Sequence, residues 1–401
     1  MTLTSVASYL ASHIIIDLKP CFNCSSGLKS QEYKIHFYLV STGAMTMSHY
    51  KTIISKCKAL CVALVMLVFV QSTQAAAHTT LAFLTWPDYM DPTILTEFEQ
   101  RTNIKVKQIY FESATERDEL LIATKGRGFD ITLVNDSSIK TLAKNCWLEP
   151  INEKEIPNLK RINPRWRAVH KNGKIYSMPY FWGSLGIAYR KDLVNSPVSS
   201  WMDLLQPTKD LHGKIAMIES ARSLMAAALK SLGYSINSTN IQEIQEAEAL
   251  LKAQAPSVKT YKYISRGESS ALVNGEIAIS MMHSSYASML QKHHDQIAFV
   301  IPKEGSNIWI DYISVLSTSN HKAEAKKFIN FLNEPEIAAR LAQFVHSATP
   351  NIDAEALLPA KFKNDPAIYP SKEVLEKSEI YNRQPAKTQK NRAAFISRLV
   401  N

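Results

Sequence analysis

The sequence predicts an α/β protein built from two similar α/β halves with a ligand cleft between them. Three observations support this fold class. Short apolar segments alternate with amphipathic segments along the chain after residue 77, the first of them follow the order βαβαβ, and a second α/β set begins after residue 183. This order predicts parallel sheets covered by helices, with ligands outside the carboxyl ends of the strands.

The first half is predicted from a regular exchange of apolar runs and amphipathic segments. Apolar runs indicate strands, and the amphipathic segments between them indicate helices. We expect strands at 81–85, 104–110 and 129–134, and helices at 93–102 and 116–124.

The second half repeats the same alternation. No tandem repeat or low-complexity run interrupts it, and the chain has only 12 glycines and no long flexible linker. We expect strands at 186–189, 214–218 and 276–282, and helices at 201–205, 223–232 and 241–254.

Residues 1–77 are predicted to be a leader that ends in a signal peptide. Three lysines at 51, 56 and 58 precede the uncharged apolar run 59–70, and small residues follow it up to Ala77. The run is too short for a membrane-spanning helix, so we expect export to the periplasm and cleavage near Ala75 or Ala77. Because Met45 and Met47 precede the basic residues, segment 1–44 is expected to lie upstream of the true start.

Charge and cysteine content exclude several classes of function. Loss of residues 1–77 removes six lysines and two acids, which lowers the formal charge from +10 to +6. The remaining basic residues are scattered, which indicates a solvated surface and predicts no nucleic-acid partner. Cys146 alone remains after cleavage, so neither an internal disulfide nor a cysteine metal site is expected.

Aromatic and acidic residues occur together at two points where strands end. The stretch FLTWPDYMDP, residues 83–92, carries Trp86, Asp88 and Tyr89, and the later stretch 308–311 carries Trp309 and Asp311. A carboxylate pairs with an organic ammonium group. An aromatic face attracts the same group through a cation–π contact, which contributes about 2 kcal/mol when water is excluded. The alternative for each residue is ordinary core packing or turn capping. Their occurrence in both halves favours a cation site in the cleft.

Several short motifs carry a resemblance that spans residues 80–369. They are WPDY at 86–89, YSMPYFWG at 176–183, SWMDL at 200–204, LGYS at 232–235, PKEG at 302–305, WID at 309–311, INFL at 329–332 and TPN at 349–351. In content and order they resemble the periplasmic spermidine/putrescine-binding proteins, which are the receptors of polyamine ABC importers.

The resemblance implies a type II periplasmic binding fold, in which two α/β lobes close on a ligand. By that pattern the first lobe comprises residues 78–185 and 309–354, and the second comprises 186–308 and 355–401. The implied partners are a small amine or polyamine and an ABC permease of the inner membrane, and the protein is expected to be a monomer.

The resemblance also implies which residues enclose the ligand. Matching family positions are Trp86, Asp88, Tyr89, Trp309 and Asp311, with Asp311 holding an amino group. Other positions depart from the family: Ser220 and Ser223 replace two acids, Ser137, His283 and Ser347 replace aromatic residues, and Asn135 replaces a serine.

The lost acids open a second possibility for the ligand. An ammonium group without a partner pays a desolvation penalty of several kcal/mol. Because Ser220 and Ser223 open a predicted helix beside Arg222, an amine ligand that also carries a carboxylate or phosphate is an alternative. Helix capping by the two serines is the structural alternative.

Two other classes of function remain as alternatives to an import receptor. One is an extracytoplasmic sensor or interaction protein on the same fold, and the other is a cleft hydrolase. No nucleophile elbow or separate acid–base pair supports catalysis, and Gly126-Arg-Gly128 precedes a strand, contrary to the dinucleotide-binding pattern. We therefore expect no enzyme activity and no cofactor. Because His283, His293 and His294 lack further ligands at a useful spacing, we also expect no metal.

Overall fold

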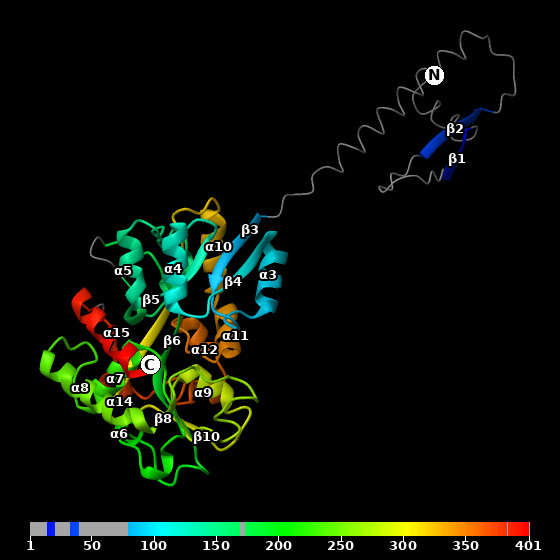
Figure 1. Ribbon diagram of the computed structural model, residues 1–401. Coiled ribbons are helices and arrows are strands. Elements are labelled where there is room, and N and C mark those ends of the chain that lie inside the picture. Colours follow the sequence, from blue (N-terminus) through cyan, green and yellow to red (C-terminus); the bar gives the residue numbers. More distant parts are fainter. Residues whose placement is uncertain (1–13, 21–32, 40–78, 169–172, 383, 401) are drawn as a thin grey trace, which may run out of the picture. The chain divides into compact units, whose positions relative to one another are not determined.

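The computed structural model describes residues 14–20, 33–39, 79–168, 173–382 and 384–400 (Figure 1). The chain forms two compact units, Met1–Ala77 and His78–Asn401. In the first unit, strand β1 (Ile14–Pro20) pairs antiparallel with β2 (Tyr33–Leu39). The predicted apolar run and cleavage site of the leader lie outside the described residues. Within the described part of the chain, no helix is long and apolar enough to cross a membrane.

The predicted βαβαβ order of the first half is confirmed. Strand β3 lies between β4 and β5 and runs parallel to both. The elements are β3 (Thr79–Thr85), α3 (Pro92–Thr102), β4 (Ile104–Tyr110), α4 (Ala114–Thr124), β5 (Ile131–Asn135) and α5 (Asp136–Lys144).

The helix starts of this half follow from local capping. The Asp91 carboxylate accepts a hydrogen bond from the Thr93 amide, and Pro92 occupies the first helical turn of α3. Asn135 caps α5 in the same way through the Ser138 amide. Each cap satisfies one of the amides that a helix start leaves without a partner. Strand β5 therefore passes directly into α5, which places polar side chains at the strand end.

Two long strands join the halves of the sheet. Strand β6 (Met178–Arg190) pairs antiparallel with β11 (Asn307–Val315) on one side and with β9 (Ile279–His283) on the other. The whole sheet has the order β4-β3-β5-β11-β6-β9-β7-β8, with β10 and β12 attached at its side. Figure 1 shows β6 and β11 passing between the half that holds α3, α4 and α5 and the half that holds α6, α7 and α8.

The second half contains the expected alternation of strands and helices. Its elements are α6 (Trp201–Leu205), β7 (Ile215–Ala216), α7 (Ala221–Ser231), α8 (Ile241–Gln254), β8 (Val258–Thr260), β9, α9 (Ser284–Leu290) and β10 (Ile297–Val300). The remaining helices and strand are α10 (Lys322–Leu332), α11 (Pro335–Val345), α12 (Ile352–Leu357), α13 (Ala360–Lys363), α14 (Lys372–Lys377), β12 (Glu379–Ile380) and α15 (Ala386–Val400). Short 3-10 turns occur at η1 (Pro157–Arg161), η2 (Pro164–Trp166), η3 (Lys209–Leu211) and η4 (Ala255–Ser257).

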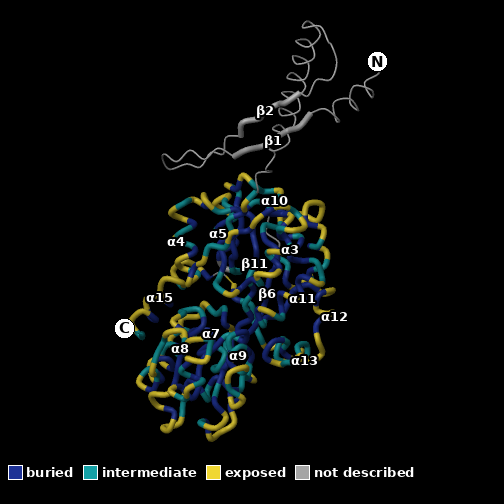
Figure 2. The backbone as a smooth tube through the Cα atoms, turned by 90° about the vertical axis from the view of Figure 1, so that its right-hand side faces the viewer, coloured by how far each residue is buried: buried dark blue, intermediate teal, exposed yellow. Residues whose placement is uncertain are grey.

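The two largest hydrophobic clusters among the described residues underlie this arrangement. The larger core gathers β3, β4, β5, α10 and α11, and a second core gathers α6, α7, α8 and β9. We call the parts of the chain around them the first and the second lobe; Figure 2 shows buried backbone in both. Leu358 and Ile368 still belong to the first core, whereas Phe395 of α15 belongs to the second. The exact lobe boundaries stay a prediction.

Candidate functional site

The turn after β3 buries the aromatic side chain of Tyr89. Asp88 adopts a left-handed backbone with φ 57°, which turns the chain so that Tyr89 is buried while the Asp88 side chain remains exposed. The Tyr89 hydroxyl donates a hydrogen bond to Asp311 Oδ2 over 3.1 Å. The end of β3 is therefore joined to the middle of β11.

Asp311 is the acidic centre of this region. The pKa of its carboxyl is raised to about 6, chiefly by burial and to a smaller extent by the nearby Asp136. The hydrogen bond from Tyr89 and the positive charge of Arg117 act in the opposite direction and lower the pKa. At pH 7 the carboxyl is mostly ionised. Because its neighbours offset only part of the cost of burying this negative charge, the carboxylate can accept a cation.

Aromatic side chains pack against both Tyr89 and Trp86. Phe181 meets the Tyr89 ring edge-on at 5.6 Å between centroids, and the Tyr180 hydroxyl donates to the Tyr89 carbonyl over 3.0 Å. Half-buried Trp86 packs edge-on against Phe111 at 4.3 Å. These contacts fix the rings by packing, so the site is formed before a ligand enters.

Trp309 lies two residues before Asp311 on β11. Its indole nitrogen donates to the Ser184 carbonyl over 3.3 Å. A Cβ atom at Gly183 would lie 2.4 Å from the Trp309 ring, so the ring rests directly on the backbone of β6 and requires glycine there. Trp86, Tyr89 and Trp309 all pack with the first core rather than in separate cores.

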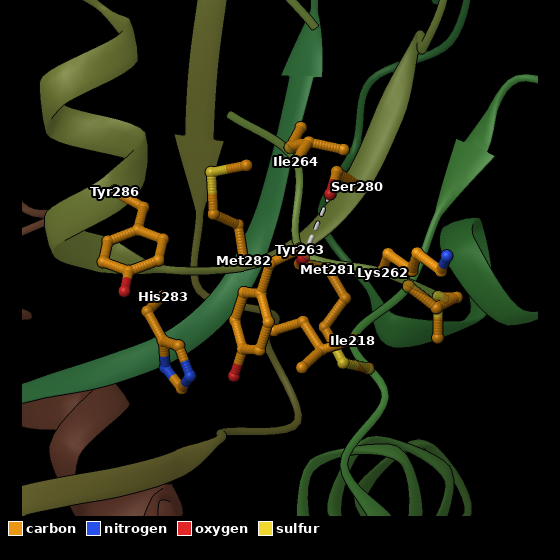
Figure 3. A pocket seen from close by; sticks show the side chains of 10 residues that line it. Ile218, Lys262, Tyr263, Ile264, Ser280, Met281, Met282, His283 and Tyr286 are labelled. Carbon is orange, nitrogen blue, oxygen red and sulfur yellow. Dashed lines mark hydrogen bonds between the residues drawn. The ribbon is translucent and has the colours of Figure 1, made fainter. Parts of the chain in front are cut away.

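His283 faces Trp309 from the second lobe. The two rings meet edge-on at 6.0 Å between centroids, and Tyr263 and Tyr286 flank His283 on other sides. Figure 3 shows Tyr263, His283 and Tyr286 among the residues that line a small cavity. Its volume of about 10 Å³ leaves room for about one water molecule. Burial and the positive charge of Arg222 lower the His283 pKa to about 4, so the imidazole is neutral at pH 7. Its Nδ1 atom is buried and has no hydrogen-bond partner within the described structure.

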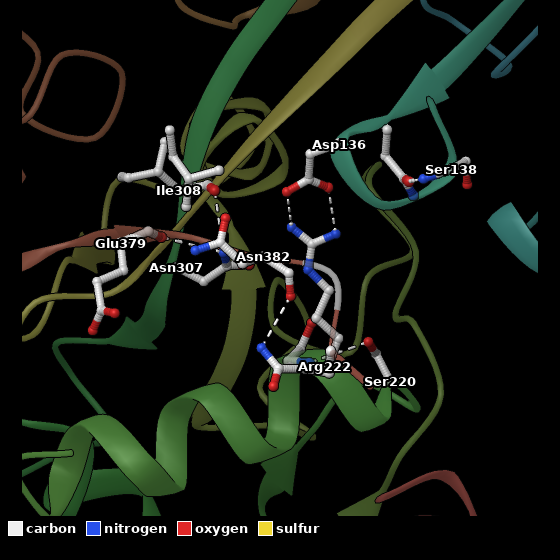
Figure 4. Close-up of polar contacts among 12 residues, drawn as sticks. Asp136, Ser138, Ser220, Arg222, Asn307, Ile308, Glu379 and Asn382 are labelled. Atoms are coloured by element: carbon white, nitrogen blue, oxygen red, sulfur yellow. Dashed lines mark hydrogen bonds and ion pairs between the residues drawn. The ribbon is translucent and has the colours of Figure 1, made fainter. Parts of the chain in front are cut away.

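A bidentate ion pair joins the two lobes beside these rings. Arg222, in the first turn of α7, donates from both terminal nitrogens to the two oxygens of Asp136 at 2.8 and 2.9 Å. Figure 4 shows the carboxylate and the guanidinium face to face between the starts of α5 and α7. A second, longer contact joins Arg266 to Asp88 at 3.5 Å. Both arginines therefore bring positive charge from the second lobe to acids of the first.

Of the two serines at the start of α7, Ser220 caps the helix. The Ser220 hydroxyl accepts a hydrogen bond from the Ser223 amide over 3.2 Å, and the Ser223 side chain is buried. Helix capping, the structural alternative for Ser220, is therefore confirmed. A cap does not prevent the hydroxyl from also contacting a ligand.

The remaining predicted residues lie at different depths. Asn135 caps α5 at the end of β5, directly opposite Asp311 in the strand register. Ser137 lies in α5, and its side chain falls outside the described part of the structure. Ser347 is buried, and its hydroxyl lacks a hydrogen-bond partner among the described residues.

Sequence reasoning missed some residues of this site. Asp136, Arg266 and Tyr286 were not expected there, although Arg222 was expected to favour an anion. The position of Asp136 directly after a buried strand was an available signal for it, because such positions lie at the ligand edge of the sheet. Arg266 and Tyr286 come from a loop and a short helix and gave no such signal.

The described residues hold no cluster of His, Cys, Asp and Glu side chains that could bind a metal ion. The region offers instead the buried Asp311 carboxylate and several ring faces, next to two arginines whose charges are paired with Asp136 and Asp88.

Comparisons with known proteins agree with this architecture. The spermidine/putrescine-binding periplasmic protein of Escherichia coli is 30% identical over 315 residues, which cover 77% of this chain and 89% of that protein. The norspermidine sensor of Vibrio cholerae is 28% identical over 326 residues, covering 81% and 89% of the two chains. The crystal structure of the spermidine/putrescine ABC transporter substrate-binding protein PotD from Streptococcus pneumoniae superposes with a TM-score of 0.71 at 29% identity, covering 80% of this chain and 98% of that one.

The family model for bacterial extracellular solute-binding proteins matches residues 93–370, which include His283, Trp309 and Asp311 of the candidate site. The sequence relatives and the shared two-lobed structure agree with this match. The chain belongs to the family of bacterial extracellular solute-binding proteins.

Proposed function

We propose that this protein is the periplasmic receptor of a polyamine-type ABC importer and binds a small protonated amine between its lobes. The observation that carries the proposal is the Asp311 carboxylate, held by Tyr89 beside Trp309. A carboxylate enclosed by ring faces binds an ammonium through charge and the methylene groups through packing. The names of the relatives in Escherichia coli and Streptococcus pneumoniae support the same class of ligand.

The leader and the delivery role belong to the same proposal. Signal-peptide features of residues 51–77 support export, and closure of the lobes on the ligand would present a surface to a permease. The protein acts as a monomer without a cofactor and without catalysis.

The end of the ligand that lies near Ser220 is not expected to be a second ammonium group. Ser220 stands where the family has an acid, and the Arg222 guanidinium lies two residues further along α7. A second ammonium in that place would meet positive charge instead of a carboxylate. We therefore rank short amines, and amines that also carry a carboxylate or phosphate, above spermidine held in the family's pose.

A sensor is the second candidate function. The norspermidine sensor of Vibrio cholerae has 28% identity to this chain, which supports a role in which ligand-bound lobes contact a signalling partner instead of a permease. Genes for a permease and an ATPase beside this gene would favour import, whereas a neighbouring membrane-bound signalling gene would favour the sensor.

Binding is tested by thermal shift and calorimetry on the exported protein. The ligands are putrescine, spermidine, 4-aminobutanoate and phosphoethanolamine, each up to saturation. A ligand at one hundred times its Kd adds about 2.7 kcal/mol of stability, which is easily measured.

The matched variants are Asp311→Asn and Asp295→Asn, because Asp295 is an exposed acid of the second lobe. We expect Asp311→Asn to abolish the shift and Asp295→Asn to keep it. Retention of full amine affinity in Asp311→Asn would refute the assignment of Asp311, and the absence of any shift in the natural protein would refute the receptor role.

A further inference from the structure

A second interlobe cavity lies beside α15, apart from the aromatic rings of the amine site. Its volume is about 540 Å³, within the range of about 300–1,000 Å³ that is usual for small-molecule sites. Helices α4 and α5 of the first lobe form one wall, and α7 and α15 of the second lobe form the other. Trp86, Tyr89 and Trp309 are not among its lining residues.

Arg392 of α15 is the most unusual residue of this cavity. Its side chain is only 2% exposed, and its two terminal nitrogens donate to the carbonyls of Ile236 and Ser238 at 3.3 and 2.6 Å. The Nε atom is buried and has no hydrogen-bond partner, and the Tyr381 side chain is a further hydrogen-bonding neighbour of the guanidinium. Within the described residues, no carboxylate forms an ion pair with it. A buried cation without a counter-ion is costly. The two backbone carbonyls offset part of this cost, and the positive charge that remains favours an anion in the cavity.

The other charged groups of the lining leave a net positive field. The terminal nitrogens of Arg222 are taken by Asp136, but its Nε is also buried without a partner. The lining acid Asp118 already accepts hydrogen bonds from Arg117 and Ser138. Lys390 stands exposed on the lining, so the cavity offers several donors and no uncommitted carboxylate within the described structure.

We propose that this cavity binds a small organic anion whose carboxylate or phosphate oxygens pair with Arg392. The apolar side chains of Leu142 and Trp147 line the remaining surface and accommodate the organic part of the ligand. Because both lobes contribute to the lining, the bound anion favours the arrangement of lobes seen in this structure.

The test is calorimetry at constant ionic strength on the exported protein with phenyl phosphate, benzoate, inorganic phosphate and benzylamine. We expect phenyl phosphate or benzoate to bind and benzylamine, a cation of the same shape, not to compete with it. The two aromatic anions distinguish a phosphate from a carboxylate preference, and inorganic phosphate reports how much the organic part contributes. The proposal is overturned if neither aromatic anion binds.

Four variants locate the binding. Arg392→Gln should weaken the anion at least about tenfold, the usual effect of losing a charged hydrogen bond. Arg398→Gln, a change at an exposed arginine of the same helix, should leave the affinity unchanged.

Ala393→Phe fills the cavity and keeps every charge, so it should abolish binding even if Arg392→Gln fails to fold. Asp311→Asn should retain anion binding, because the acid belongs to the amine site. Equal binding in Ala393→Phe, or loss of binding in Asp311→Asn, would overturn the separate cavity.

Discussion

The hydroxyl of Tyr89 donates to the carboxylate of Asp311 over 3.1 Å, although the two residues are 222 positions apart in the sequence. The bond ties the turn after β3 to the crossover strand β11. It supplies one donor to a carboxylate whose pKa burial raises to about 6, so the acid is left partly unsatisfied and ready for a cation.

Amine binding should therefore depend on pH near 6. The ammonium of the ligand stays protonated over this range, so of these two binding partners only Asp311 changes its charge. Below pH 6 the carboxyl takes up a proton that the ligand must displace, and affinity should fall by about tenfold per pH unit. Calorimetry at pH 5 and pH 7.5, in buffers of different ionisation enthalpy, measures both the affinity and the proton released at the lower pH.

Tyr89→Phe provides the control for this pH profile. The variant removes a hydrogen bond that lowers the Asp311 pKa, so the midpoint of the profile should move to higher pH. A profile that is flat between pH 5 and 7.5 in the natural protein would contradict the role of Asp311.

His283 should make the protein less stable in acid. Its folded-state pKa of about 4 lies below the unfolded value of about 6.5, so the unfolded chain binds more protons between these limits. The free energy of unfolding should therefore fall as the pH drops through that window. From pH 7 to pH 5 the loss due to His283 amounts to about 2 kcal/mol.

The measurement is urea unfolding of His283→Phe at the two pH values. The variant should lose less stability at pH 5 than the natural protein, whereas His212→Phe, at an exposed position, should behave like the natural protein. His346, whose pKa burial also lowers to about 4, accounts for part of the loss that remains. An unchanged pH dependence in His283→Phe would show that this imidazole is not held neutral.

The predicted alternation of strands and helices located most elements, and the crossover strand shows where it failed. The sequence predicts a strand only at 186–189, but β6 begins at Met178. Pro179 and Gly183 interrupt the usual strand pattern, and the run between them is almost wholly apolar, so it lacks the alternation that marks a half-buried strand. Pairing with β11, which is distant in the sequence, together with burial of the segment determines this part of the strand.

The acid and the rings of the candidate site were predictable because strand ends collect ligand residues. Trp86, Tyr89, Trp309 and Asp311 could be named from two short stretches of sequence. The Asp136–Arg222 pair could not, because it depends on how closely α5 approaches α7 across the lobes. No local pattern records that distance.

Gly183→Ala should weaken amine binding through Trp309. The added Cβ would lie 2.4 Å from Cζ2 and 2.8 Å from Cε2 of the indole, so the ring must leave the backbone of β6. Overpacking of this kind costs about 1–3 kcal/mol of stability. Tryptophan fluorescence and calorimetry should show a displaced ring and a lower affinity. Gly267→Ala is the matched control, because nothing lies within 4 Å of its added Cβ; equal affinity in the two variants would refute the packing argument.

The Asp136–Arg222 ion pair should hold the lobes together in the absence of ligand. The side chains are 9% and 21% exposed, so the pair is screened less than a surface pair, and it joins α5 of the first lobe to α7 of the second. Removal of one charge leaves the other partly buried, which costs about 2 kcal/mol for a pair of this exposure. The cost is avoided if the lobes separate and water reaches the remaining charge.

Asp136→Asn should therefore open the lobes and raise the radius of gyration measured by small-angle scattering, and saturating ligand should restore it. Asp192→Asn breaks an ion pair to Arg190 inside the second lobe and should leave the radius unchanged. If both variants keep the radius of the natural protein, the pair between α5 and α7 does not determine how the lobes are arranged.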